Sequence, residues 1–276
     1  MEENRLNYLK SQANRLRRQI VNMCYGVGPE RKAHPGPALS IADVVAALYF
    51  DKMNIIPDQP AARQRDRLIL SKGHACTVLY SALQMKGILT SEDLKGFRHI
   101  DGMLQGHPDM KGTPGVDMTA GSLGNGLSAG VGMALAAKID QLEYRVYVIL
   151  GDGECQEGLV WEAAMLAPKY HLDNLIAIVD QNGLQSCDSV ENTMPMEPWK
   201  ERWESFGWNV ISIDGHNMEQ ICEALDKVAN AKGKPTVILA HTIKGKGVSF
   251  MENNNAWHQK TLTQEEYQIA LEELGG

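Results

Sequence analysis

The sequence predicts an α/β fold in which a mostly parallel sheet is covered by helices on both faces. Short apolar runs, typical of buried strands, alternate along the chain with longer segments of helical periodicity. The strand runs are continuously apolar instead of alternating with polar residues, which indicates a sheet that is buried on both faces. Neither a repeat nor a low-complexity linker interrupts the pattern, so we expect residues 1–276 to form a single domain.

The elements follow from this pattern in chain order. Strands are expected at the apolar runs 67–70, 145–150, 174–180, 208–213 and 235–240. Helices are expected at 4–23, 40–50, 74–86, 122–140, 157–170, 217–231 and 263–273. Three segments are expected to be functional loops: 98–121, rich in Gly, Pro and His, and the polar stretches 183–198 and 244–258.

The composition excludes several classes of protein. A hydrophobic content of 43% and a charged content of 22% over 276 residues are ordinary for a soluble globular protein. The apolar runs are too short to span a membrane, and the charged N-terminal segment has no apolar signal core, so we expect no membrane association. This segment is interpreted as a first helix with a basic, solvated face around Arg15, Arg17 and Arg18. The net charge of −7 gives no reason to expect nucleic-acid binding.

The cysteines favour a reducing compartment. There are five of them, scattered and without a CxxC pair, which is typical of free thiols in the cytoplasm and not of a disulfide framework. Cys155 lies inside the most informative motif of the chain. We interpret it as a small residue that fills space beside a turn, and not as a nucleophile.

That motif is Gly151-Asp152-Gly153, which follows an apolar strand, while Asn182 follows the next strand. Both polar residues are therefore expected at the carboxyl ends of neighbouring parallel strands, where open α/β sheets bind ligands. A carboxylate and an amide carbonyl are hard oxygen ligands for a divalent cation, and the glycines let backbone N–H groups approach an anion. The pattern predicts a cation that holds a diphosphate. An ordinary turn with a capping Asp is the alternative.

Four histidines lie in Gly- and Pro-rich surroundings near expected element ends: His34, His74, His107 and His258. Imidazoles suit a site that handles sugar hydroxyls and phosphate oxygens, because each can donate, accept or carry charge near neutral pH. His241, at the end of a strand, competes with His258 for the fourth place and is otherwise a structural histidine.

Two lysines, Lys244 and Lys246, lie in the sequence TIKGKG. They either attract the phosphate of a sugar or belong to a solvated basic loop; the sequence supports both interpretations equally.

The chain resembles the transketolases, a family of thiamine diphosphate (TPP) enzymes. The GDG motif and the Asn after the next strand are similar to the TPP signature, and AHPGPALS, SKGHACTVLY, QGHPDM and TAGSLGNGLSAG follow one another as the family's motifs do. The first motif reads AHPG where the family has GHPG. The resemblance covers essentially the whole chain and implies a TPP-binding fold. It also implies that Asp152, Asn182 and the backbone carbonyl of Leu184 hold Mg²⁺, or Ca²⁺ or Mn²⁺ in its place.

The resemblance further implies roles for the remaining site residues. His34 and His107 face the sugar substrate, and with His74 they move or stabilise protons on its oxygens. The cofactor contacts that it implies are His74 and His258 near the diphosphate, Gly153 against the diphosphate through its backbone, and Gly121 and Leu123 along the aminopyrimidine. Glu157 resembles an acidic residue at the subunit interface that links paired active sites.

Long transketolases continue into a pyrimidine-binding domain, which supplies a Glu that activates the cofactor. This sequence contains no second region of that kind. The resemblance therefore implies the N-terminal subunit of a split transketolase, with a separate C-terminal subunit in an α2β2 heterotetramer. The implied reaction transfers a two-carbon ketol unit from a ketose, phosphorylated in our interpretation, to an aldose.

Other functions remain open at this point. One alternative is the α chain of a 2-oxoacid dehydrogenase, but ketol transfer needs the His set and lipoamide-linked decarboxylation does not. Another is a 1-deoxyxylulose-phosphate synthase, which would require the pyrimidine-binding half on the same chain. A non-catalytic regulatory subunit with the same fold is disfavoured by the intact Asp152, Glu157 and Asn182. A plain dinucleotide-binding domain would need GxGxxG directly after the first strand, whereas GSLGNG follows a loop.

Overall fold

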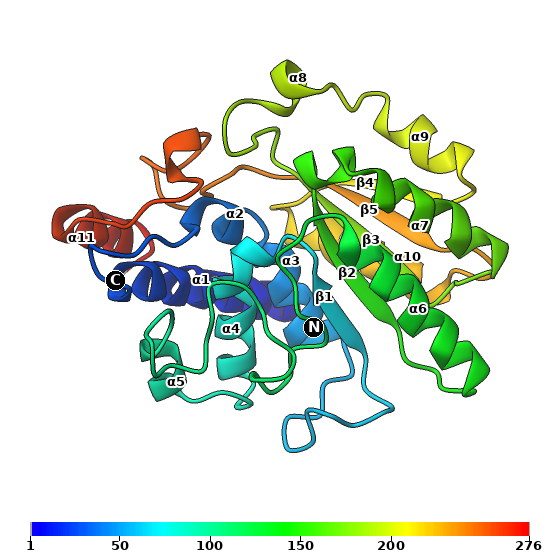
Figure 1. The fold of residues 1–276 in the computed structure, drawn as a ribbon, viewed down its shortest axis with the longest axis horizontal. Helices are drawn as coiled ribbons and strands as arrows, with labels where there is room; N and C mark the ends of the chain where they lie inside the picture. Colours follow the sequence, from blue (N-terminus) through cyan, green and yellow to red (C-terminus); the bar gives the residue numbers. More distant parts are fainter. Residues whose placement is uncertain (1, 276) are drawn as a thin grey trace.

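Five apolar segments form one parallel sheet at the centre of the computed structural model, which describes residues 2–275. The strands are β1 Arg67–Leu70, β2 Val146–Gly151, β3 Leu175–Gln181, β4 Asn209–Asp214 and β5 Thr236–His241. Their order is β1-β2-β3-β5-β4, and every neighbouring pair is parallel (Figure 1). Each predicted strand is confirmed within one residue at either end.

Both faces of the sheet are buried, as the continuously apolar strands predict. Successive side chains of a strand point to opposite faces. In β2, Tyr147 and Ile149 pack into one hydrophobic cluster, whereas Val146, Val148 and Leu150 pack into the other. The first cluster is covered by α1 Glu2–Gly26, α3 Ala42–Ala47, α4 Cys76–Met85, α10 Met218–Asn230 and α11 Gln264–Glu273. The second is covered by α6 Asn125–Ile139, α7 Gly158–Lys169 and α9 Trp199–Ser205.

The predicted helix 40–50 is confirmed within two residues, as a continuous helical run whose last turn is π-helical and which a separate short helix precedes. The structure has α2 Pro35–Ser40, α3 Ala42–Ala47 and a π-helical turn at Leu48–Lys52. Proline suits the first turn of a helix, which explains the start of α2 at Pro35. Ile41 separates α2 from α3, with φ −102° and ψ 6°.

The other predicted helices are confirmed, with a short 3₁₀ turn, Gly73–Ala75, before α4. Four helices were not predicted: α2, α5 Ser91–Lys95, α8 Val190–Thr193 within the expected loop 183–198, and α9. Further 3₁₀ turns cover Gly153–Gln156 and Asn255–Trp257. None of the helices in residues 2–275 is long and apolar enough to cross a membrane.

The face of α1 that was predicted to be solvated is partly wrong. Arg15 is exposed, but Arg17 is buried against Asp43 of α3. A buried guanidinium requires a charged partner, and Asp43 supplies it.

Candidate functional site

A cavity of about 330 Å³ opens at the carboxyl ends of β1, β2 and β3. Its volume lies within the range of small-molecule sites, about 300–1,000 Å³. The structure brings most of the predicted site residues together around it: His74, Leu123, Asp152, Gly153, Glu157, Asn182, Leu184 and His258. Parallel pairing of β2 with β3 places the residues that follow both strands at the same edge of the sheet.

The end of β2 presents the buried carboxylate of Asp152. One of its oxygens accepts a hydrogen bond from the N–H of Gly153 at 2.8 Å, and the other accepts one from the N–H of Gly183 at 2.6 Å. Burial raises the pKa of Asp152 to about 6, and the nearby carboxylate of Asp180 adds to the rise. This carboxylate has no cationic side chain of its own within bonding distance among the described residues, so a divalent cation would supply the missing charge.

The turn after β3 presents two further oxygens. The side-chain nitrogen of Asn182 donates to Asp180 at 3.1 Å, and its oxygen accepts from the N–H of Leu184 at 3.1 Å, which settles the orientation of the amide. Asn182 and Leu184 both line the cavity beside Asp152. A carboxylate, an amide oxygen and a peptide carbonyl form a donor set that suits Mg²⁺ or Ca²⁺.

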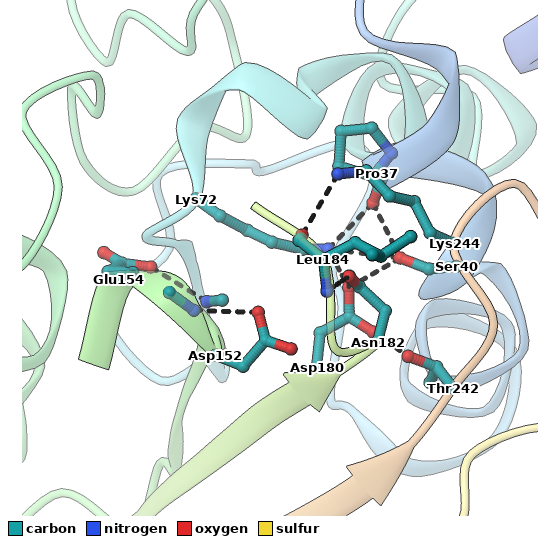
Figure 2. Close-up of polar contacts among 12 residues, drawn as sticks. Pro37, Ser40, Lys72, Asp152, Glu154, Asp180, Asn182, Leu184, Thr242 and Lys244 are labelled. Carbon is teal, nitrogen blue, oxygen red and sulfur yellow. Dashed lines mark hydrogen bonds and ion pairs between the residues drawn. The ribbon is translucent and has the colours of Figure 1, made fainter. Parts of the chain in front are cut away.

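Asp180, which is fully buried, organises this edge of the sheet. It accepts hydrogen bonds from Lys72, Ser40, Thr242 and Asn182, and Figure 2 shows these side chains converging on it from separate segments. Burial by itself would raise the pKa of Asp180, but the Lys72 ammonium and the hydroxyl donors hold it below its ordinary value. Asp180 therefore remains an anion and fixes Asn182 in place.

Glu154 joins three of the sequence motifs. One of its oxygens accepts from the hydroxyl of Ser71 and from the N–H of Gly124 at 2.9 Å; the other accepts from the N–H of Gly151 at 3.0 Å. Burial raises its pKa, although these bonds oppose the rise. The SKGHA, GSLGNG and GDG segments are thereby tied to one side chain.

The four predicted histidines form one cluster; His74 and His258 line the cavity, and His34 and His107 lie behind them in the cluster without lining it. The ring centroid of His34 lies 5.3 Å from that of His74, 5.5 Å from that of His258 and 6.3 Å from that of His107. Burial lowers the pKa of His34 to about 4 and that of His258 to about 3, with neighbouring positive groups adding to both shifts. All four have lowered pKa values, so they are neutral imidazoles near pH 7.

Lys244 reaches into the cavity, although it lies in one of the loops expected to be polar. Its ammonium donates to the carbonyl of Leu184 at 3.0 Å (Figure 2). It also donates to the carbonyl of Gln185 at 2.9 Å and to Nδ1 of His258 at 3.0 Å. Nδ1 of His258 is therefore an acceptor, and the ring hydrogen lies on Nε2. Burial lowers the pKa of Lys244 to about 8.

The two lysines of TIKGKG have different surroundings. Lys244 is 1% exposed and lines the cavity. Lys246 pairs with Glu252 at 3.2 Å in a half-exposed position and belongs to a solvated loop.

Several other predicted residues lie at the margin or elsewhere. Gly121 packs against the ring of His107, where an added Cβ would lie 3.7 Å from it, and does not itself line the cavity. His241 bonds to the hydroxyl of Ser212 at 2.8 Å and stays apart from the histidine cluster. Cys155 is fully buried beside the turn, as a space-filling residue would be, and burial raises the pKa of its thiol well above the ordinary value.

The sequence reasoning missed Lys72, Asp180, Ser40 and Glu154. Asp180 carried a usable signal, because a carboxylate at the end of a continuously apolar strand needs a buried partner. Its partners are distant in sequence: Ser40 lies 140 positions away and Lys72 lies 108 positions away. A single sequence does not pair such residues.

Comparison with known proteins gives consistent matches. The family model described as transketolase, thiamine diphosphate binding domain, matches residues 15–276. The 6-deoxy-6-sulfo-D-fructose transketolase subunit SqwG of Clostridium sp. (strain MSTE9) is 47% identical, with 96% of both chains covered. An apulose-4-phosphate transketolase subunit of Phocaeicola vulgatus is 41% identical over 96% of this chain and 93% of its own. The solved transketolase of Campylobacter jejuni superposes with a TM-score of 0.91 at 36% identity, covering 97% of this chain but 42% of that longer one.

Proposed function

This chain belongs to the transketolase family, and on that premise we propose that it is the TPP-binding subunit of a two-chain transketolase. The enzyme would transfer a two-carbon ketol unit from a ketose to an aldose, with the ketose carrying an anionic group such as phosphate. The observation that carries the proposal is the cluster of four neutral histidines, two of which line one cavity together with three hard oxygen donors.

The residues present fit TPP and a divalent cation. Asp152, Asn182 and the carbonyl of Leu184 would hold Mg²⁺, which would also offset the charge of the buried Asp152. Lys244 and the backbone of Gly153 would face the diphosphate, and Leu123 the aminopyrimidine. The bound cofactor supplies carbanion chemistry that amino-acid side chains lack.

The histidines would handle the sugar. Neutral imidazoles donate and accept hydrogen bonds at once, so His34 and His107 would bind sugar hydroxyls and move protons on their oxygens. His258 would present Nε2–H, because Lys244 occupies its Nδ1. His74, beside both His34 and His258, would serve the cofactor and the substrate.

We also propose a separate pyrimidine-binding partner, two copies of each chain, a single domain spanning residues 1–276 and a cytosolic location. The relatives named as subunits have about the length of this chain, whereas the Campylobacter jejuni transketolase is longer. The outer surface of α6 and α7 supports a partner, because it exposes Ile139 (72%), Met165 (57%) and Leu166 (41%). Glu157 would lie in that interface.

The experiment that tests the proposed site is Mg²⁺-dependent binding of TPP to the full chain by titration calorimetry. The wild-type chain is expected to bind, and Asp152→Ala is expected to lose the Mg²⁺-dependent heat. Asp140→Ala, which removes an exposed carboxylate after α6, is the matched control and is expected to bind as the wild type does. Full TPP affinity in Asp152→Ala would contradict the site.

A further inference from the structure

A buried triad outside the cavity joins Arg17 of α1, Asp43 of α3 and His216, which follows β4. Arg17 binds both oxygens of Asp43, through Nη1 at 3.2 Å and through Nη2. Nδ1 of His216 lies 2.8 Å from the same carboxylate. The side chains are 9–12% exposed, so solvent screens this triad weakly.

The triad is bonded to the backbone on both sides of Lys244. The N–H of Ile243 donates to Nε2 of His216 at 2.8 Å, and Nε of Arg17 donates to the carbonyl of Lys246 at 3.1 Å. A peptide N–H only donates, so Nε2 of His216 accepts and the ring hydrogen lies on Nδ1, which donates to Asp43. Each ring nitrogen therefore has a defined role, and the carboxylate sets the tautomer.

Lys244 transmits this geometry to the cavity. Its ammonium donates to Leu184, Gln185 and His258, which all line the cavity, whereas His216 and Arg17 do not. The segment around it has little freedom to compensate: Gly245 has φ +80°, and a Cβ there would lie 2.3 Å from the carbonyl oxygen of Met251. A displaced Ile243 peptide would therefore displace the ammonium as well.

We propose that His216, oriented by Asp43 and Arg17, is a positioning residue that fixes Lys244 for the diphosphate of the cofactor. The inference rests on the proposed function, since it assumes that a diphosphate binds in this cavity. His216→Leu would remove both hydrogen bonds. His216→Gln keeps a donor and an acceptor at a similar spacing and is the conservative rescue variant.

The test is titration of the full chain with TPP in Mg²⁺, with urea unfolding of each variant measured in parallel. His216→Leu is expected to weaken binding about tenfold, as the loss of about one net hydrogen bond would. His216→Gln is expected to bind within about threefold of the wild type. His171→Leu changes an exposed histidine that lies after α7, at the opposite edge of the sheet, and is expected to bind normally.

A double-mutant cycle separates positioning from general stabilisation. In a Lys244→Met background, His216→Leu is expected to have little further effect on TPP affinity, while its effect on the urea midpoint persists. An unchanged affinity in His216→Leu, or an equal loss in both backgrounds, would overturn the positioning role. Failure of the wild-type chain to bind TPP even in the presence of its pyrimidine-binding partner would instead refute the proposed function.

Discussion

The ion pair between Lys72 and Asp180 is predicted to be essential for stability. Lys72 is 2% exposed and Asp180 is fully buried, and the Lys72 ammonium also donates to the carbonyl of Pro37 at 2.7 Å. Lys72→Met keeps an unbranched chain of similar reach and removes the charge. The carboxylate of Asp180 would keep neutral donors from Ser40, Thr242 and Asn182, but no cation.

Leaving a buried charge without its partner costs about 3–5 kcal/mol. With a urea slope of about 3 kcal/mol per molar, the unfolding midpoint of Lys72→Met is expected to fall by about 1 to 1.7 M. Lys72 contributes to holding the pKa of Asp180 low, so its removal lets that pKa rise. The variant's deficit is therefore expected to be full near neutral pH and to shrink as acid protonates Asp180.

The assay is urea unfolding followed by circular dichroism at two pH values. Lys95→Met makes the same chemical change in an exposed ion pair with Glu92 and is expected to cost less than about 0.5 kcal/mol. In an Asp180→Asn background, Lys72→Met is expected to cost much less than in the wild type, because no buried charge is left uncompensated. A midpoint for Lys72→Met no lower than that of Lys95→Met would refute the reasoning.

Three further predictions concern other parts of the molecule. Glu154→Gln places an amide nitrogen against N–H donors and is expected to lower the free energy of unfolding by about 1–3 kcal/mol. Urea unfolding measures this loss, and an unchanged midpoint would show that the carboxylate does not hold the three motifs together. Burial lowers the pKa of His34 to about 4 in the folded chain, whereas its ordinary pKa in the unfolded chain is 6.5. Between these two values the unfolded chain takes up a proton that the folded chain does not, so the folded chain loses stability as pH falls from 6.5 toward 4. The free energy of unfolding, measured by acid unfolding without cofactor, is therefore expected to fall by about 3 kcal/mol less in His34→Asn than in the wild type between neutral pH and pH 4. Identical acid profiles would contradict the assignment. Met165→Glu, on the outer surface of α7, is expected to weaken association with the partner chain at least about tenfold in sedimentation experiments. The stability of the isolated chain is expected to change by less than about 0.5 kcal/mol. Undiminished association would place the interface elsewhere.

The sheet could be predicted closely because each strand is a continuous apolar run buried on both faces. β3, for example, runs through Leu175–Gln181 with its apolar residues fully buried, and no competing period confuses that pattern. Short helices were harder. α5 begins with a capping box between Thr90 and Asp93. This signal is present in the sequence, but apolar periodicity does not reveal it.

The candidate site could be predicted where the residues of a short sequence motif lie together in the site. GDG and the later Asn182 predicted a shared edge of the sheet, and parallel pairing of β2 with β3 provides it. The supporting charges were not predictable, because Lys72 and Asp180 meet only once the sheet has formed. Lys244 shows the same limit: its loop is polar in sequence, yet its ammonium is buried by contacts with Leu184 and His258.

The most direct test of the central proposal is ketol transfer from xylulose 5-phosphate to ribose 5-phosphate with TPP and Mg²⁺. It would be measured with this chain alone, with its C-terminal partner chain alone and with both together. The proposed two-chain transketolase predicts activity in the mixture and none in either chain alone. Turnover by this chain alone would contradict it, because the pyrimidine-binding half would then have to lie within these 276 residues.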